Sequence, residues 1–325
     1  MKICVLGLDG AAAEMIGGDE RLVNVRRLMD LGLYGRLEAG IPSQAVPAWI
    51  CMSTSQKPPA DRGADADSFT AATIWDQLAR EGKKSIIVGV PPNYPPRQVN
   101  GISVGCFRTP DTVHHGFTNP PEIGSKINQL VGEYPVDVGN LGSGHKDLLK
   151  EQIFSMSRKQ WEVVRWLLSE QEWGYFHFVD IGLDRMYQVF LSDFDEKHAQ
   201  FKPGNPYRSV IPDYYAWLDE QIGAVLELLD NETMVLLLSP YAAPAASSGM
   251  FILFAPNCPL TGEYEGASML DMAPTLLDLA GYEIPQAMQG KSLVAGMQKK
   301  TPNAGPDQSE ADKIIHDRLA GLGYV

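Results

Sequence analysis

Residues 41–55 read IPSQAVPAWICMSTS. Pro42, Pro47 and the small polar residues near them break regular structure, whereas small and apolar residues continue without a breaker from Ala48 to Ser55. The stretch therefore predicts a loop that enters a helix at about Ala48. The N-terminus of a helix directs free N–H groups and positive potential outward, which suits a phosphate or a nucleophile that attacks phosphorus.

Apolar runs and amphipathic segments alternate over the rest of the chain. Short apolar runs predict strands at 2–8, 84–90, 175–181, 233–239 and 251–255, and helical spacing predicts helices at 22–33, 72–82, 150–169, 214–229 and 269–280. A loop-rich, proline-punctuated region at about 108–150 predicts an insertion or cap. The last segment, 299–325, reads as a polar tail with a short terminal helix.

Composition limits the class of protein. The chain has 325 residues, of which 44% are apolar and 21% charged, as in ordinary globular proteins. The net charge of −13 argues against general nucleic-acid binding, although a local site on an acidic protein can still hold a phosphorylated ligand. No apolar run approaches membrane-spanning length. The chain starts directly on a strand and its four cysteines are scattered, which predicts a reduced, cytoplasmic protein.

Several segments together resemble the alkaline phosphatase superfamily in its type I phosphodiesterase/nucleotide pyrophosphatase branch. They are, in chain order, Leu8-Asp9-Gly10, the stretch 41–55, the proline-rich 91–96, Asp184-Arg185, the stretch 269–280 and Gln289–Leu293. The resemblance runs from Met1 to about Leu293. It implies an α/β domain over 1–298, with a doubly wound, mostly parallel central sheet, helices on both faces and a smaller inserted cap.

The departures from the family pattern fall at its reactive positions. The resemblance places the nucleophilic Thr at Ala45, and a methyl group cannot attack phosphorus or bind a metal. One metal would use Asp9, Ala45, Pro240 and Tyr241, of which Asp9 alone is a good ligand. The other would use Asp184, Gln188 and a residue in 242–249, a segment without His, Asp, Glu or Cys. Two isolated carboxylates cannot hold two zinc ions, so no metal cofactor is expected.

The coordinated replacements predict a pseudoenzyme that has lost two-metal hydrolysis. Such a protein would bind a small molecule, phosphorylated or not, or a protein partner such as an active paralogue, and neither nucleic acid nor a membrane. The candidate ligand-binding residues are Val46, Trp49, Arg62, Arg185 and Gln188. Both arginines fit a surface or structural ion pair slightly better than a role in ligand binding.

The alternative hypothesis is an enzyme with altered chemistry in the same cleft. It would be metal-independent or would use one weakly held divalent ion. Asp9, Asp184, Tyr241 and His198 are the candidate acids and bases, because their side chains can carry or accept a proton.

Overall fold

One mixed sheet organises the protein, with the strand order β5-β4-β3-β6-β1-β7-β8-β2-β9. The computed structural model describes residues 1–38, 45–58, 71–243, 247–256, 258, 260–295 and 297. Its strands are β1 (Lys2–Leu8), β2 (Leu33–Arg36), β3 (Ser85–Val88), β4 (Gly101–Val104), β5 (Thr118–Asn119), β6 (Tyr175–Asp180), β7 (Thr233–Ala242), β8 (Ser247–Phe254) and β9 (Gly262–Glu263).

The centre of the sheet is parallel. β4, β3, β6, β1 and β7 run in the same direction, whereas β8 and β5 are antiparallel to their neighbours. The central strands read as continuous apolar runs because both faces of a parallel sheet are covered. In β6 every residue is buried. The predicted α/β class with a mostly parallel sheet is confirmed.

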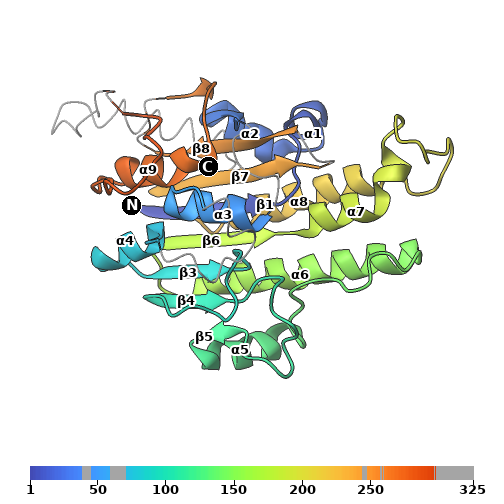
Figure 1. Cartoon of the computed structure of the whole chain (residues 1–325), viewed down its shortest axis with the longest axis horizontal. Coiled ribbons are helices and arrows are strands. Elements are labelled where there is room, and N and C mark those ends of the chain that lie inside the picture. The colour runs from blue at the N-terminus through green and yellow to red at the C-terminus, as the bar shows by residue number, and fades with distance from the viewer. Residues whose placement is uncertain are drawn as a thin grey trace. The chain divides into compact units, whose positions relative to one another are not determined.

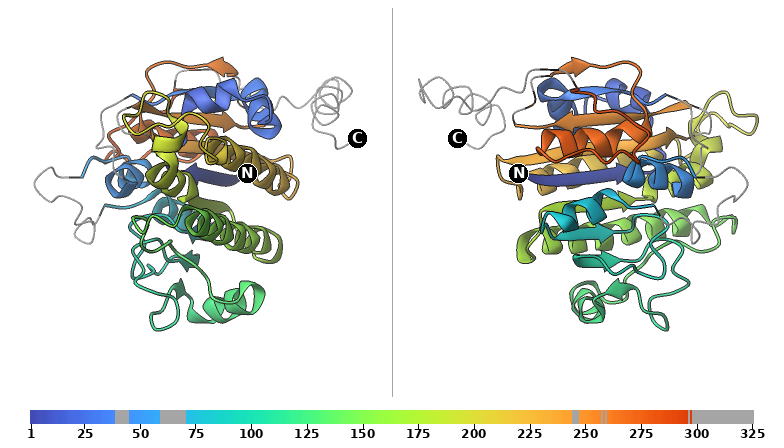
Figure 2. Two further views of the ribbon diagram at one scale, coloured as in Figure 1. Left: turned by 90° about the vertical axis from the view of Figure 1, so that its right-hand side faces the viewer. Right: turned by 60° about the vertical axis from the view of Figure 1, so that its left-hand side comes forward.

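Helices cover both faces of the sheet (Figures 1 and 2). α3, α4 and α9 lie on one face, where α3 contacts the other two, while α2, α6, α7 and α8 lie on the opposite face. The helices are α1 (Ala13–Gly18), α2 (Val23–Leu31), α3 (Ala45–Thr54), α4 (Ile74–Arg80), α5 (Pro121–Val131), α6 (Lys146–Glu170), α7 (Gly182–Phe194), α8 (Val210–Leu226) and α9 (Met269–Leu279).

Two predicted boundaries were wrong near the expected site. α3 already includes Ala45, three residues before the predicted start, because Pro47 lies in the first turn, where its missing N–H costs no helical hydrogen bond. β7 extends past residue 239 to pair with β8 in a hairpin. Gly249 lies opposite Pro240, and a Cβ at Gly249 would come within 2.5 Å of the Pro240 carbonyl oxygen, so the close approach of the two strands requires glycine at 249.

Met1–Ala295 form one compact unit. The predicted cap region contains β5, which pairs with β4, so part of that region joins the main sheet. The predicted tail, 299–325, lies outside the described residues. In the part of the chain that the structure describes, no helix combines the length and apolar character needed to cross a bilayer.

The α3 helix packs closely on β1 at one glycine. A Cβ at Gly7 would lie 2.3 Å from Cη2 of Trp49 and 2.9 Å from Cγ2 of Val179. The Trp49 side chain is fully buried, so the indole has no room to move away. Gly7 therefore sets how near the helix can approach the strand.

We expect Gly7→Ala to lower the free energy of unfolding by roughly 3 kcal/mol, because the new methyl group overpacks the contact with Trp49. Gly17→Ala is the matched control, since a Cβ at this exposed helical position meets no atom within 4 Å. The control should stabilise the protein by up to about 1 kcal/mol. Urea unfolding measures both, and equal stability of the two variants would contradict this packing constraint.

Candidate functional site

Three neighbouring strands end at the same edge of the sheet. β6, β1 and β7 are adjacent and parallel, so their carboxyl ends meet there. Asp9 follows β1, Asp184 lies in the first turn of α7 just after β6, and Tyr241 is near the end of β7. The fold therefore brings together three of the four candidate acids and bases.

Asp9 is almost completely buried, and its carboxylate is engaged inside the protein. Trp49 Nε1–H donates a hydrogen bond of 2.8 Å to Asp9 Oδ1. The pKa of Asp9 is raised from 3.8 to about 7, chiefly by burial and also by the Asp184 and Asp180 charges, while the Trp49 hydrogen bond and Arg185 oppose the rise. Asp9 is therefore an acid that exchanges its proton near neutral pH.

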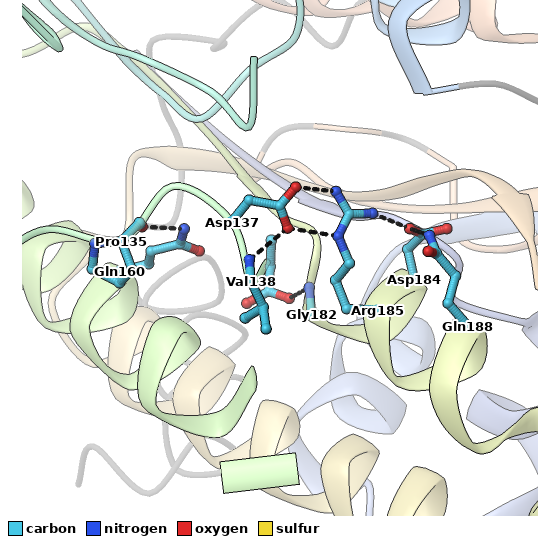
Figure 3. Close-up of polar contacts among 9 residues, drawn as sticks. Pro135, Asp137, Val138, Gln160, Gly182, Asp184, Arg185 and Gln188 are labelled. Carbon is cyan, nitrogen blue, oxygen red and sulfur yellow. Dashed lines mark hydrogen bonds and ion pairs between the residues drawn. The ribbon is translucent and has the colours of Figure 1, made fainter. Parts of the chain in front are cut away.

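Asp184 belongs to a charged network with Arg185 (Figure 3). Arg185 Nη1 donates to Asp184, and its Nε and Nη2 each donate a 2.7 Å bond to Asp137. Gln188 Nε2 donates to Asp184 Oδ2 at 2.5 Å, and the Phe107 ring lies 5.6 Å from the guanidinium carbon. Burial raises the pKa of Asp184, while Arg185 lowers it. Arg185 and Gln188, two of the predicted ligand-binding residues, thus each donate a hydrogen bond to Asp184.

Tyr241 completes the cluster from the β7 side. Burial raises the pKa of its phenol well above 10, and the negative charges of Asp9 and Asp184 raise it further. The charges of Asp9 and Asp184 therefore both raise the pKa of the Tyr241 phenol, which stays protonated at neutral pH.

The other predicted residues have different positions. Ala45 and Val46 lie in the first turn of α3, and Val46 packs against Ile50 and Phe107. His198 lies beyond the far end of α7, more than ~15 Å along the helix from Asp184. Its Nδ1 accepts a hydrogen bond from the backbone N–H of Gln200, so the fold does not bring His198 to the cluster. Arg62 lies outside the described residues.

Sequence reasoning missed three residues of the cluster. Asp137 and Phe107 come from the region between β4 and α6, and both contact Arg185. Asp180 ends β6 and is fully buried, but its carboxylate accepts bonds from Trp161 Nε1 at 2.8 Å and from the Gly182 backbone N–H at 2.7 Å. No sequence signal singles out Asp137. Asp180 follows an apolar run much as Asp9 does, and that pattern could have found it.

The two carboxylates at the metal-ligand positions of the family pattern have hydrogen-bond partners within the chain. The family resemblance assigns Asp9 and Asp184 as metal ligands. Asp184 accepts hydrogen bonds from Arg185 and Gln188, and Asp9 accepts one from Trp49. The Gln188 amide donates an N–H to Asp184 Oδ2. Among the residues that the structure describes, no three His, Cys, Asp or Glu side chains gather as a metal site.

Comparison with solved structures gives the class of fold. A phosphonate monoester hydrolase from Silicibacter pomeroyi is similar with a TM-score of 0.54 at 13% identity, over 94% of this chain and 78% of that chain. A putative sulfatase from Bacteroides thetaiotaomicron has a TM-score of 0.54 at 13% identity, over 94% and 76%. A protein in the alkaline phosphatase superfamily from Vibrio parahaemolyticus has 0.50 at 15%, over 90% and 69%. The fold is therefore that of the alkaline phosphatase superfamily.

The sequence places the chain more narrowly. The family model described as type I phosphodiesterase/nucleotide pyrophosphatase matches residues 3–249. Because this match covers more than half of the 325 residues, the chain belongs to that family. No protein with a curated description matches the sequence.

We expect Asp9→Asn to change how stability depends on pH. Well below pH 3.8 Asp9 is neutral in both the folded and the unfolded protein, and the folded state loses stability as pH rises from 3.8 toward 7, since only the unfolded carboxyl ionises freely. Asn carries no charge and still accepts from Trp49. The stability difference between the variant and wild type should be small at pH 4, and the variant should exceed the wild-type free energy of unfolding by up to about 4 kcal/mol at pH 8.

Asp30→Asn is the matched control, because Asp30 is an exposed carboxylate near the end of α2. Its stability difference from wild type should be the same at both pH values. Urea unfolding across pH 4–8 measures all three proteins. Parallel curves for Asp9→Asn and wild type would show that burial of Asp9 is not linked to its protonation.

Proposed function

We propose that this member of the phosphodiesterase family binds a ligand or partner and does not hydrolyse phosphoesters by the two-metal route. The observation that carries the proposal is the occupation of the surviving ligand positions. Asp9 is hydrogen-bonded to Trp49, and Asp184 is paired with Arg185 and Gln188. A cation would have to displace these partners while gaining no ligand from Ala45.

The electrostatics of the cluster support the same conclusion. A two-metal centre needs several anionic ligands that are held apart and free to coordinate. Here Arg185 supplies positive charge from within the chain, close to Asp184 and Asp137. Asp9 is partly protonated near pH 7, because burial raises its pKa to about 7. Arg185 thus offsets part of the negative charge of the cluster from within the chain.

The proposed ligand is a small molecule, phosphorylated or not, at the carboxyl edge of β6, β1 and β7. Ligands of open α/β sheets bind at that edge, which supports the location. A protein partner, such as an active paralogue, would use the same face of the molecule. A cytoplasmic location is part of the proposal, supported by four free cysteines, three of them buried.

A second candidate function is an enzyme with altered chemistry in the same cleft. The observation that favours it is the perturbed Asp9, whose pKa of about 7 suits a general acid or base at neutral pH. Tyr241 is a neutral phenol beside it that could donate a hydrogen bond to a developing negative charge. This candidate predicts turnover in the presence of a chelator.

We expect purified wild-type protein to contain almost no zinc, manganese or magnesium and to gain no thermal stability when these ions are added. It should not hydrolyse simple aryl phosphodiesters. Elemental analysis, thermal unfolding and a colorimetric assay test this. About two tightly bound ions per chain, with hydrolysis, would overturn the proposal, whereas metal-free turnover would favour the second candidate.

A variant with restored ligands is the matched positive control. Ala45→Thr, Gln188→His, Pro240→Asp and Tyr241→His together return the residues that the family pattern has at these positions. This variant should bind at least one zinc ion per chain and melt at a higher temperature with zinc than without it. If the variant folds but binds zinc no better than wild type does, the residues at these four positions do not determine metal binding.

A further inference from the structure

The Arg185 guanidinium has the geometry of an oxyanion receptor. Its Nε and Nη2 form a fork that donates two parallel bonds of 2.7 Å to the two oxygens of Asp137. A phosphate, sulfate or carboxylate group binds arginine in the same two-point manner. The guanidinium is also held in place, because Nη1 donates to Asp184 and the guanidinium carbon lies over the Phe107 ring, 5.6 Å from its centroid.

Asp137 lies on the outer side of this fork. Its side chain is 30% exposed, whereas that of Arg185 is 12% exposed. The preceding residues are held separately. Thr112 donates to the Tyr134 carbonyl oxygen at 2.7 Å, and Gln160 donates to that of Pro135 at 2.9 Å (Figure 3). Rotation of the Asp137 side chain out of the fork would break the 2.7 Å bond that its Oδ1 accepts from the Val138 N–H, but it would leave these two anchors in place.

We propose that Asp137 is an internal occupant of an oxyanion receptor formed by Arg185, and that an external oxyanion binds the Nε and Nη2 edge when Asp137 swings out. The inference rests on the proposed function, because it takes this edge of the sheet to be a binding site. The contact between Asp137 and Arg185 is thus autoinhibitory. It keeps the receptor paired when no ligand is present.

This competition sets the affinity for the ligand. The apparent dissociation constant equals the intrinsic one divided by the fraction of molecules whose fork is open. In wild type that fraction is small, because the two bonds are charge-assisted and the arginine is mostly buried. Asp137 also repels an incoming anion. A ligand that reaches the fork must therefore carry an oxyanion and other groups that add binding energy.

We expect Asp137→Ala to bind inorganic phosphate with an apparent dissociation constant at least roughly tenfold lower than that of wild type. Isothermal titration calorimetry at constant ionic strength measures the binding. Sulfate and acetate in place of phosphate distinguish a tetrahedral from a planar oxyanion. The double variant Asp137→Ala with Arg185→Gln should lose the gain, because it lacks the receptor.

Asp213→Ala is the matched control for net charge. It removes one carboxylate that pairs with Arg21 at 2.9 Å and whose side chain is 54% exposed. Its phosphate affinity should equal that of wild type. Equal affinities of Asp137→Ala and Asp213→Ala would overturn the proposal, and so would a gain that survives the loss of Arg185.

A measurement on the wild-type protein covers the case in which the variant does not fold. Amide hydrogen exchange of Val138, whose N–H donates a 2.7 Å bond to Asp137 Oδ1, should become faster in high phosphate but not in chloride of equal ionic strength. Unchanged exchange at saturating phosphate would contradict the rotation. Neither experiment depends on metal binding. Detection of bound metal and hydrolysis would therefore contradict the proposed function without contradicting the oxyanion receptor. Equal phosphate affinity of the variants would contradict the receptor without contradicting the proposed function.

Discussion

The hydrogen bond between Trp49 and Asp9 is the interaction on which the site depends. The indole lies against Gly7 of β1 while its N–H reaches the carboxylate two residues further along the chain. One side chain thus fixes the distance between α3 and the sheet and also supplies the partner of a buried acid. Without that donor Asp9 would be a buried carboxyl with an unsatisfied oxygen, which is costly in an apolar interior.

The charged groups at the sheet edge are arranged so that each has a partner within the chain. Arg185 lies between Asp184 and Asp137, and Asp180 is held by Trp161 and a backbone N–H. Removal of Arg185 would leave the Asp184 and Asp137 carboxylates without their cation in a partly buried place. The resulting loss of stability would exceed the net contribution of the ion pairs to folding. The cluster is therefore stable as a unit, and single replacements within it have disproportionate effects.

The sequence was sufficient for the fold and for the place of the acids, but not for their partners. Asp9 and Asp184 could be located because each follows a strand whose parallel direction puts its end at a common edge. The partner Asp137 is 48 residues from Arg185 in sequence, in a region of irregular structure where no periodic pattern indicates which side chain points inward. The start of α3 was misplaced because Pro47 reads as a breaker, although proline is tolerated in a first turn.

The turn after β1 has a consequence for how the side chains of such a site can be replaced. Gly10 has a φ of +85° and approaches so closely that a Cβ there would lie 3.2 Å from the Asp184 Cα. The spacing between the two strand ends is thus set by backbone against backbone, and the side chains contribute little to it. Replacement of the Asp9 or Asp184 side chain would therefore leave this backbone contact in place, although the new side chain would still have to satisfy the partners of the old one.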